Sequence, residues 1–245
     1  MTFVLAKKEQ MSNPKILRFI ILLLLLIAGL AVLGQDKRSP MIWMEATQKT
    51  VFNPQFSTTL LYQRRVFVMK DHTYQQILWA GGNVQLTPKV TLGGGLIYFV
   101  YHRNIGERFG NVPEIRPFQY VNFHRQVGAV NLSLRTMAEA RFLSTVVHDQ
   151  VEIADRFNVR VRLRLKGHIP LGKQLLLEVS NEAFFNGHFL STHTFDQNRW
   201  VNRLIYKRGN WQLHGGVMHW WVNGAHGWQH RPTALIGLNY SYSRL

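Results

Sequence analysis

Arginine and glutamate residues that recur at every second position are the side chains best placed to do chemistry. From Arg156 to Ile169, charged and polar residues occupy the even positions and mostly apolar residues the odd ones. Successive side chains of a β-strand point to opposite faces, so this spacing predicts a strand with one cationic face. Guanidinium groups on such a face could bind anions or pair with carboxylates on facing strands. The charged residues expected to share the interior are Arg135, Glu139, Arg141, Arg160, Arg162, Arg164, Glu178, Glu182 and Arg199.

The link after this strand sets which residues lie opposite one another. The segment Pro170 to Gly172 predicts a tight turn, and the next alternating segment carries carboxylates on the same face. Opposed side chains on one face of a hairpin can form ion pairs. Together, the nine charged residues form a belt inside the predicted barrel. This belt has two interpretations: the paired polar filling of a barrel, or an anion-selective constriction or binding site. A hairpin centred on Leu171 would pair Arg164 with Glu178, Arg162 with Ser180 and Arg160 with Glu182.

Other residues that could do chemistry form weaker patterns. Ser180 lies between Glu178 and Glu182, but the sequence places no histidine beside it that would activate a nucleophile. The segment from Phe195 to Arg199 is interpreted as polar rim structure, with a ligand site as the alternative. Five histidines in predicted loops could ligate a metal only if the loops converged. We therefore expect no catalytic group, no metal site and no cofactor, and the sequence favours a protein that is not an enzyme. The histidines are His148, His188, His193, His226 and His230.

The composition narrows the class of protein. Lysine and arginine number 29 against 13 acidic residues, giving a net charge of +16. Charged residues make up only 17% of the chain, against roughly 25% in globular proteins, whereas aromatic residues reach 12%. Without cysteine there is no disulfide, thiolate metal site or cysteine nucleophile. A basic chain could bind nucleic acid, but an export signal argues against this and favours contact with phosphorylated membrane lipid.

Residues 1–34 have the three-part pattern of a secretory signal peptide. Basic residues precede an apolar run from Phe19 to Gly34, and small or tolerated residues occupy the −3 and −1 positions of a cleavage site. The alternative is a retained anchor, because this run approaches the roughly 17–25 residues of a spanning helix. The expected organisation is a signal peptide helix over 1–34, an N-terminal periplasmic segment over 35–56 and a barrel over 57–245.

Alternation with period two recurs through the mature chain and predicts an all-β protein. Tight links alternate with longer polar links at 103–113, 144–155, 187–194 and 223–232, as in outer-membrane barrels. We expect a single antiparallel up-and-down transmembrane β-barrel of about ten strands, with both termini in the periplasm. A further strand at 42–51 is possible, so that twelve strands are an alternative. The ten expected strands are 57–69, 74–86, 90–102, 114–126, 130–143, 156–169, 174–186, 195–207, 211–222 and 233–244.

A soluble lipocalin-like barrel would show the same alternation with its two faces exchanged. Three features favour the membrane form. Several segments span 12–14 residues, more than the usual ~5–6 of soluble sheets. Aromatic residues cluster at segment ends, as membrane interfaces require. The last strand carries Gly237, Tyr240 and Tyr242 in a spacing that resembles the C-terminal signal read by the outer-membrane assembly machinery.

Five short motifs follow one another from about Glu114 to the C-terminus. They are Arg116-Pro117-Phe118-Gln119, Glu139-x-Arg141-Phe142, Arg160-x-Arg162-x-Arg164-Leu165, the stretch from Glu178 to Phe184, and Phe195-Asp196-Gln197-Asn198-Arg199. In this order they resemble an uncharacterised family, domain of unknown function 2490. The resemblance implies an outer-membrane-barrel-like protein of Bacteroidetes, and it implies no chemistry.

The sequence thus predicts an outer-membrane β-barrel protein of the structural or the small-solute and anion channel type. The alternatives are an outer-membrane enzyme that modifies lipid, in the manner of an acyltransferase or deacylase, and a soluble lipocalin-like binding barrel. The expected partners are outer-membrane lipid and the assembly machinery, which would read the C-terminal strand. No nucleic acid is expected as a partner.

Overall fold

A computed structural model of the protein describes residues 40–68, 73–105, 108–148, 150–187, 194–224 and 227–244. The predicted signal peptide, residues 1–34, lies outside the described residues. Within the described ranges there is no helix long and apolar enough to cross a membrane.

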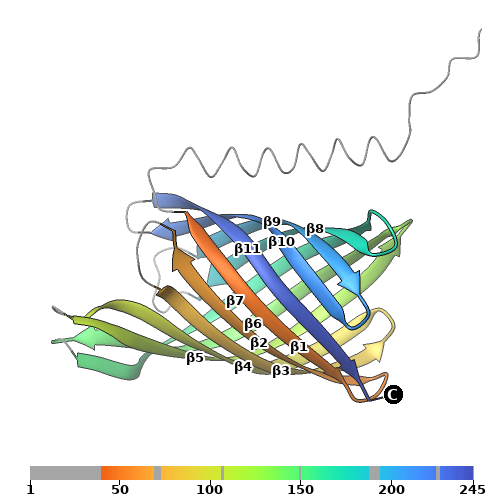
Figure 1. The fold of residues 1–245 in the computed structure, drawn as a ribbon. Helices are drawn as coiled ribbons and strands as arrows, with labels where there is room; N and C mark the ends of the chain where they lie inside the picture. The colour runs from red at the N-terminus through yellow and green to blue at the C-terminus, as the bar shows by residue number, and fades with distance from the viewer. Residues whose placement is uncertain are drawn as a thin grey trace, which may run out of the picture.

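The described residues form one closed barrel of eleven strands (Figure 1). Consecutive strands pair antiparallel around the wall, which confirms the predicted all-β up-and-down barrel. Eleven lies between the ten strands expected and the twelve considered possible. The strands are β1 (Met41–Val51), β2 (Phe56–Phe67), β3 (Thr73–Thr87), β4 (Val90–Ile105), β5 (Arg108–Val127), β6 (Val130–Val147), β7 (Gln150–Pro170), β8 (Leu175–Asn186), β9 (Phe195–Arg208), β10 (Trp211–Gly224) and β11 (Gly227–Ser243).

The first and last strands close the barrel as a parallel pair. Met41 lies opposite Thr233, and the pairing continues along the whole of β1. β1 is the further strand considered at 42–51, so the barrel begins at Met41, inside the range 35–56 predicted as a periplasmic segment. The expectation that the barrel begins and ends on one side is wrong. An odd number of strands puts the start of β1 and the end of β11 at opposite ends of the barrel.

Three of the expected long loops are largely strand. Backbone pairing continues to Ile105 opposite Arg108, to Val147 opposite Gln150, and to Gly224 opposite Gly227. The polar residues of these stretches suggested loops, but their backbone groups hydrogen-bond across the hairpin and extend it. Figure 1 shows the hairpins around β5 and β6 projecting well beyond the rest of the wall. Most of the fourth expected loop, 187–194, lies outside the described residues.

The wall carries charge on its inner face and large apolar side chains on its outer face. On β7, Asn158 and Arg160 are buried inside the barrel, whereas Leu163 and Leu165 point outward with 43% and 56% of their surface exposed. The inner face is not wholly polar. One apolar cluster lies at the seam between β1, β10 and β11, and a second lies on β3 to β6. Their buried members are Met41, Trp43, Met218, Trp220 and Leu235 in the first, and Ile77, Ile97, Phe99, Phe118 and Met137 in the second.

Candidate functional site

The predicted charged belt lies inside the barrel, on strands β6 to β9. Eight of its nine residues line one central cavity of about 420 Å³. The ninth, Glu139, is completely buried beside them. Strand alternation places these side chains on one face, because even-numbered residues of β7 and β8 oppose odd-numbered residues of β6 and β9.

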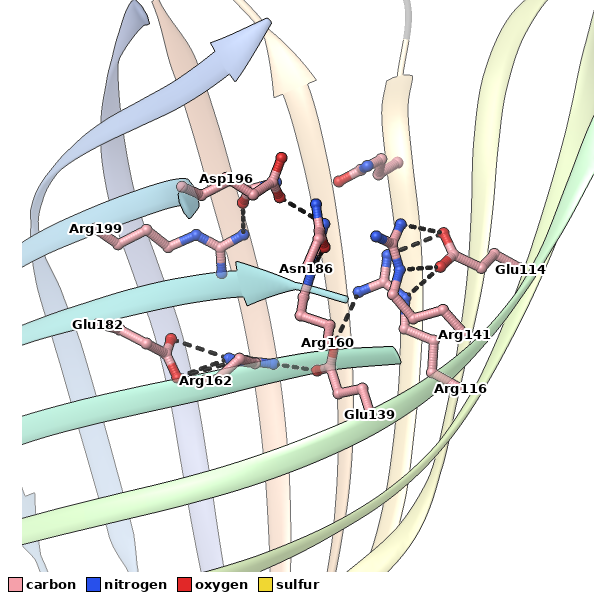
Figure 2. Close-up of polar contacts among 12 residues, drawn as sticks. Glu114, Arg116, Glu139, Arg141, Arg160, Arg162, Glu182, Asn186, Asp196 and Arg199 are labelled. Atoms are coloured by element: carbon pink, nitrogen blue, oxygen red, sulfur yellow. Dashed lines mark hydrogen bonds and ion pairs between the residues drawn. The ribbon is translucent and has the colours of Figure 1, made fainter. Parts of the chain in front are cut away.

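Glu139 is at the centre of a chain of ion pairs that runs along the inner face of the wall from β5 to β8 (Figure 2). One of its carboxylate oxygens accepts from Nη1 of Arg162 at 2.5 Å, and the other lies 3.5 Å from Nη1 of Arg116. Arg162 also contacts Glu182 at 2.9 Å, and Glu182 in turn accepts from Arg135 at 2.7 Å. These charges are largely shielded from water, so the pairing offsets the cost of burying them.

A second carboxylate, Glu114, extends this network along β5. Nε of Arg116 and Nε of Arg141 each donate to its Oε1 at 2.7 Å. The hydroxyl of Tyr101 donates to its Oε2 at 2.9 Å and accepts from Nη2 of Arg116 at 2.9 Å. The guanidinium of Arg116 also stacks on the ring of Phe99, with 3.7 Å between its central carbon and the ring centroid. This part of the interior is therefore held in one arrangement by matched charges.

The predicted register of the hairpin between β7 and β8 is wrong. Arg164 lies opposite Glu182, and His168 lies opposite Glu178. The tight turn centred on Leu171 is in fact a longer link, in which the amide of Leu171 bonds the carbonyl of Leu175. The longer link slides β8 by four residues against β7. An even slip keeps each side chain on its face, so the residues still point inward while their partners change.

Glu178, near the start of β8, is the centre of a separate group of charged residues. Its Oε2 lies 2.9 Å from Nε2 of His168 and 3.7 Å from Nζ of Lys166, and its Oε1 lies 3.8 Å from Nε of Arg203. Arg203 also donates to Glu45 at 3.0 Å. Through Arg203 the group on β7 and β8 is connected to β1.

Glu45 makes polar contacts across the parallel seam. It faces Gly237 of β11, and Nε2 of His214 on β10 lies 3.1 Å from its Oε1. Gln63 of β2 donates to its Oε2 at 3.0 Å. A Cβ on Gly237 would lie 2.4 Å from His214 and 2.5 Å from Glu45, so a larger residue does not fit here without displacing them. Because Gly237 has no side chain, Glu45 of β1 can contact His214 of β10 across β11.

Arg160 is held by the segment that follows the link to β9. Its Nη2 donates to Oδ2 of Asp196 at 2.6 Å, and its Nε donates to Asn186 at 2.9 Å (Figure 2). The polar segment from Phe195 to Arg199 is therefore partly an ion-pair element of the interior. Gln197 of this segment accepts from the indole of Trp220 and from Arg199.

The cavity has many more cations than carboxylates. Ten arginines and Lys166 line it, against Glu45, Glu178 and Glu182. Adding Glu114, Glu139 and Asp196, which contact these arginines, raises the carboxylates only to six. The cavity can therefore attract anions and repel cations.

The weaker candidates gain little from the structure. Ser180 is buried, and no hydrogen bond joins it to a histidine in the described part of the chain. His148 is exposed on the β6–β7 hairpin, and His230 stacks with His219 and Trp221. No group of three or more potential metal ligands occurs among the described residues. His188, His193 and His226 lie outside them.

Sequence reasoning missed several charged residues of the network. Glu114 and Arg116 occupy alternate positions at the start of the strand expected at 114–126, but the inward face of that strand was not assigned. Glu45 lies on a strand considered only as a possibility, and Arg203 lies on a strand whose charges do not alternate regularly. Alternation traced through β1 and β9 would have included both residues.

Comparison with known families gives one match. A family model described as "Protein of unknown function (DUF2490)" covers residues 41–231. The chain belongs to this family. The match begins with β1, well ahead of Glu114, where the five motifs begin. Neither the curated proteins nor the solved structures contain a match to the chain.

Proposed function

We propose that the protein is an outer-membrane β-barrel, exported by its signal peptide. The supporting observation is the apolar outer wall. Large apolar side chains point away from the barrel on most of its strands, among them Leu60, Leu78, Leu96, Leu134, Leu163, Leu165, Leu213, Ile236 and Leu238. A soluble monomer rarely exposes so many large apolar side chains on one surface, whereas lipid tails would cover them. A soluble lipocalin-like barrel would need the opposite arrangement, with polar residues outside.

Aromatic side chains at both ends of the wall support this location. Near the tight turns, the rings of Trp211 and Tyr240 lie 4.5 Å apart on the outer face, and Tyr242 is exposed beside them along β11. Near the opposite end, Phe195 lies 5.1 Å from Trp228, and both are exposed. Such groups are suited to the two membrane–water interfaces. Outer-membrane lipid is the partner proposed for this wall.

The orientation follows from the wiring of the strands. Tight turns such as that at Gly209 lie at the same end as the C-terminus, and the projecting hairpins lie at the other. Short turns normally face the periplasm. We propose that the assembly machinery reads β11 from that side, through the spacing of Gly237, Tyr240 and Tyr242. The start of β1 then faces outward.

Membrane fractionation with heat-modifiability on a gel tests the location. The full chain should sediment with the outer membrane and should migrate differently before and after boiling. Recovery in the soluble periplasmic fraction with no change in mobility would refute the proposal. Impermeant labelling of single cysteines placed at Asn210 and Arg103 tests the orientation, because the two should react from opposite sides.

For the interior, we propose an anion channel, one of the two types of barrel expected from the sequence. The observation that carries this is the excess of eleven cationic side chains over six carboxylates at the cavity. Reconstitution in a planar bilayer tests it by conductance and reversal potential. The expected result is a small current that favours anions over cations. A barrel with no conductance, or with cation preference, would remove the channel function.

A further inference from the structure

We propose that the cavity contains a binding site for a small multivalent oxyanion, of which inorganic phosphate is the simplest. The site is a row formed by Arg135, Arg164 and Arg199. This inference rests on the proposed anion function of the interior and adds a ligand class and a place. It does not require that the barrel be inserted in a membrane.

The three arginines lie on one rung of the barrel wall. Arg135 of β6 lies directly opposite Arg164 of β7, Arg164 lies opposite Glu182 of β8, and Glu182 lies opposite Arg199 of β9. Directly opposed residues have Cβ atoms about 4.5–5.5 Å apart. Like charges in such positions repel each other, so a row of three arginines with one glutamate lowers stability unless a further anion balances it.

The single carboxylate of this rung is already engaged. Oε1 of Glu182 accepts from Arg135 at 2.7 Å and from Arg162 at 2.9 Å, and Oε2 accepts from Arg162 at 2.9 Å. Within the described residues, no carboxylate lies within 4 Å of the guanidinium nitrogens of Arg164 or Arg199. The Nε atoms of Arg135, Arg164 and Arg199 are shielded from solvent and make no hydrogen bond to the described chain. Two cations, those of Arg164 and Arg199, are thus left without a carboxylate partner for a ligand to balance.

Aromatic rings hold one of these cations in place. The guanidinium carbon of Arg199 lies 4.4 Å from the ring centroid of Phe184 and 5.1 Å from those of Trp43 and Trp220 (Figure 2 shows Arg199). Contacts with ring faces support a guanidinium without using its N–H donors. Because Nη2 of Arg199 donates to Gln197 at 3.3 Å, only the rest of the edge of the group remains for a ligand.

Ligand chemistry follows from the guanidinium groups and the excess of charge. The planar fork of arginine matches two oxygens of a phosphate, whereas a monoatomic anion offers the fork only one acceptor atom. A dianion also balances two positive charges, the number that Arg164 and Arg199 leave without a carboxylate partner. The cavity of about 420 Å³ is large enough for a phosphate or a small phosphomonoester. A phosphate-type oxyanion is therefore the ligand class that the row fits.

Thermal unfolding of the purified full chain in detergent tests the site. Inorganic phosphate is titrated at constant ionic strength, with chloride as the replaced anion. Phosphate should raise the unfolding midpoint in a saturable way, because a ligand that binds only the folded state stabilises it. A variant with Arg164→Gln and Arg199→Gln should show at least about tenfold weaker apparent affinity, from the loss of charge-assisted hydrogen bonds.

Arg125→Gln is the matched control, because it removes one positive charge from the exposed outer surface. It should keep the wild-type response to phosphate. Equal midpoints of the wild type in phosphate and in chloride would overturn the proposal, whether or not any variant folds. So would a folded double variant with wild-type affinity. Arg164→Gln alone serves if the double variant does not show a heat-modifiable band.

The test separates this inference from the proposed function. Phosphate binding by a barrel that carries no current would keep the site and remove the channel. An anion current with no saturable response to phosphate would keep the channel and remove the site. Recovery of the protein from a soluble fraction would affect the location alone.

Discussion

Two parts of the barrel interior contain arginines and treat them differently. On β5 to β7, Arg116 and Arg162 each contact two glutamates. On β7 to β9, Arg164 and Arg199 contact none among the described residues. The first arrangement is what a polar core needs, since each buried charge has a partner. The second leaves two buried cations without a carboxylate to balance them, although Arg199 packs against aromatic rings, and this points to a use for the charge. The structural interpretation of the belt therefore applies to the paired arginines, and the functional interpretation applies to Arg164 and Arg199.

The largest expected effect is on the paired side. Glu139→Gln removes the carboxylate between Arg116 and Arg162 and leaves both cations buried without that partner. Loss of one partner from a buried pair costs about 3–5 kcal/mol, so the unfolding midpoint in urea should fall sharply or the folded band on a gel should disappear. Glu152→Gln, on the exposed hairpin, is the control and should be neutral. Equal stability of the two variants would show that the paired network does not support the barrel.

An intermediate effect is expected at the seam, where Glu45 belongs to the paired class. Gly237→Ala would push a methyl group into His214 and Glu45 and should cost about 1–3 kcal/mol by overpacking. Gly215→Ala is the matched control on the neighbouring strand, since the nearest atom would lie 3.7 Å away. The free energy of unfolding should separate the two variants. If both cost the same, the close fit of Glu45 over Gly237 is not what closes the barrel.

The smallest effect on stability, and the one of opposite sign, is expected on the unpaired side. Arg164→Gln removes a cation that opposes Arg135. In phosphate-free buffer the free energy of unfolding should therefore stay the same or rise by a few tenths of a kcal/mol. Arg162→Gln, one rung away and doubly paired, should instead lower it. Destabilisation by both substitutions to the same extent would remove the distinction between the two regions.

The sequence predicts the faces of this barrel better than its pairing. Alternation from Arg156 to Ile169 places every side chain on its observed side, because a strand has a period of two whatever its neighbours are. The partner of Arg164 could not be predicted in the same way, since it depends on the conformation of the link at 171–174. The excess of cations over carboxylates was visible in the composition, but its position on one rung requires the register.

The parallel closure was also beyond the sequence. Pairing of β1 with β11 joins the two ends of the chain, and local patterns carry no information on such distant contacts. The polar stretches of the hairpins suggested loops for a related reason, since their backbone pairing extends past the part of the wall where alternation of polarity is required. Glu45 was missed because the strand that carries it adds an odd member to a barrel expected to have an even number.

If the outer wall of the barrel faces lipid, a charge placed on that wall should destabilise the folded protein. Leu163 lies on the outer face of β7 between Arg162 and Arg164, whereas Ile153 is 70% exposed on the β6–β7 hairpin. Folding of Leu163→Arg and of Ile153→Arg into lipid vesicles would be compared by urea titration. A wall that faces lipid should give a loss of about 2–4 kcal/mol for the first variant and little change for the second. Wild-type stability for Leu163→Arg would contradict a lipid-facing wall, because an arginine on a water-exposed wall costs almost nothing.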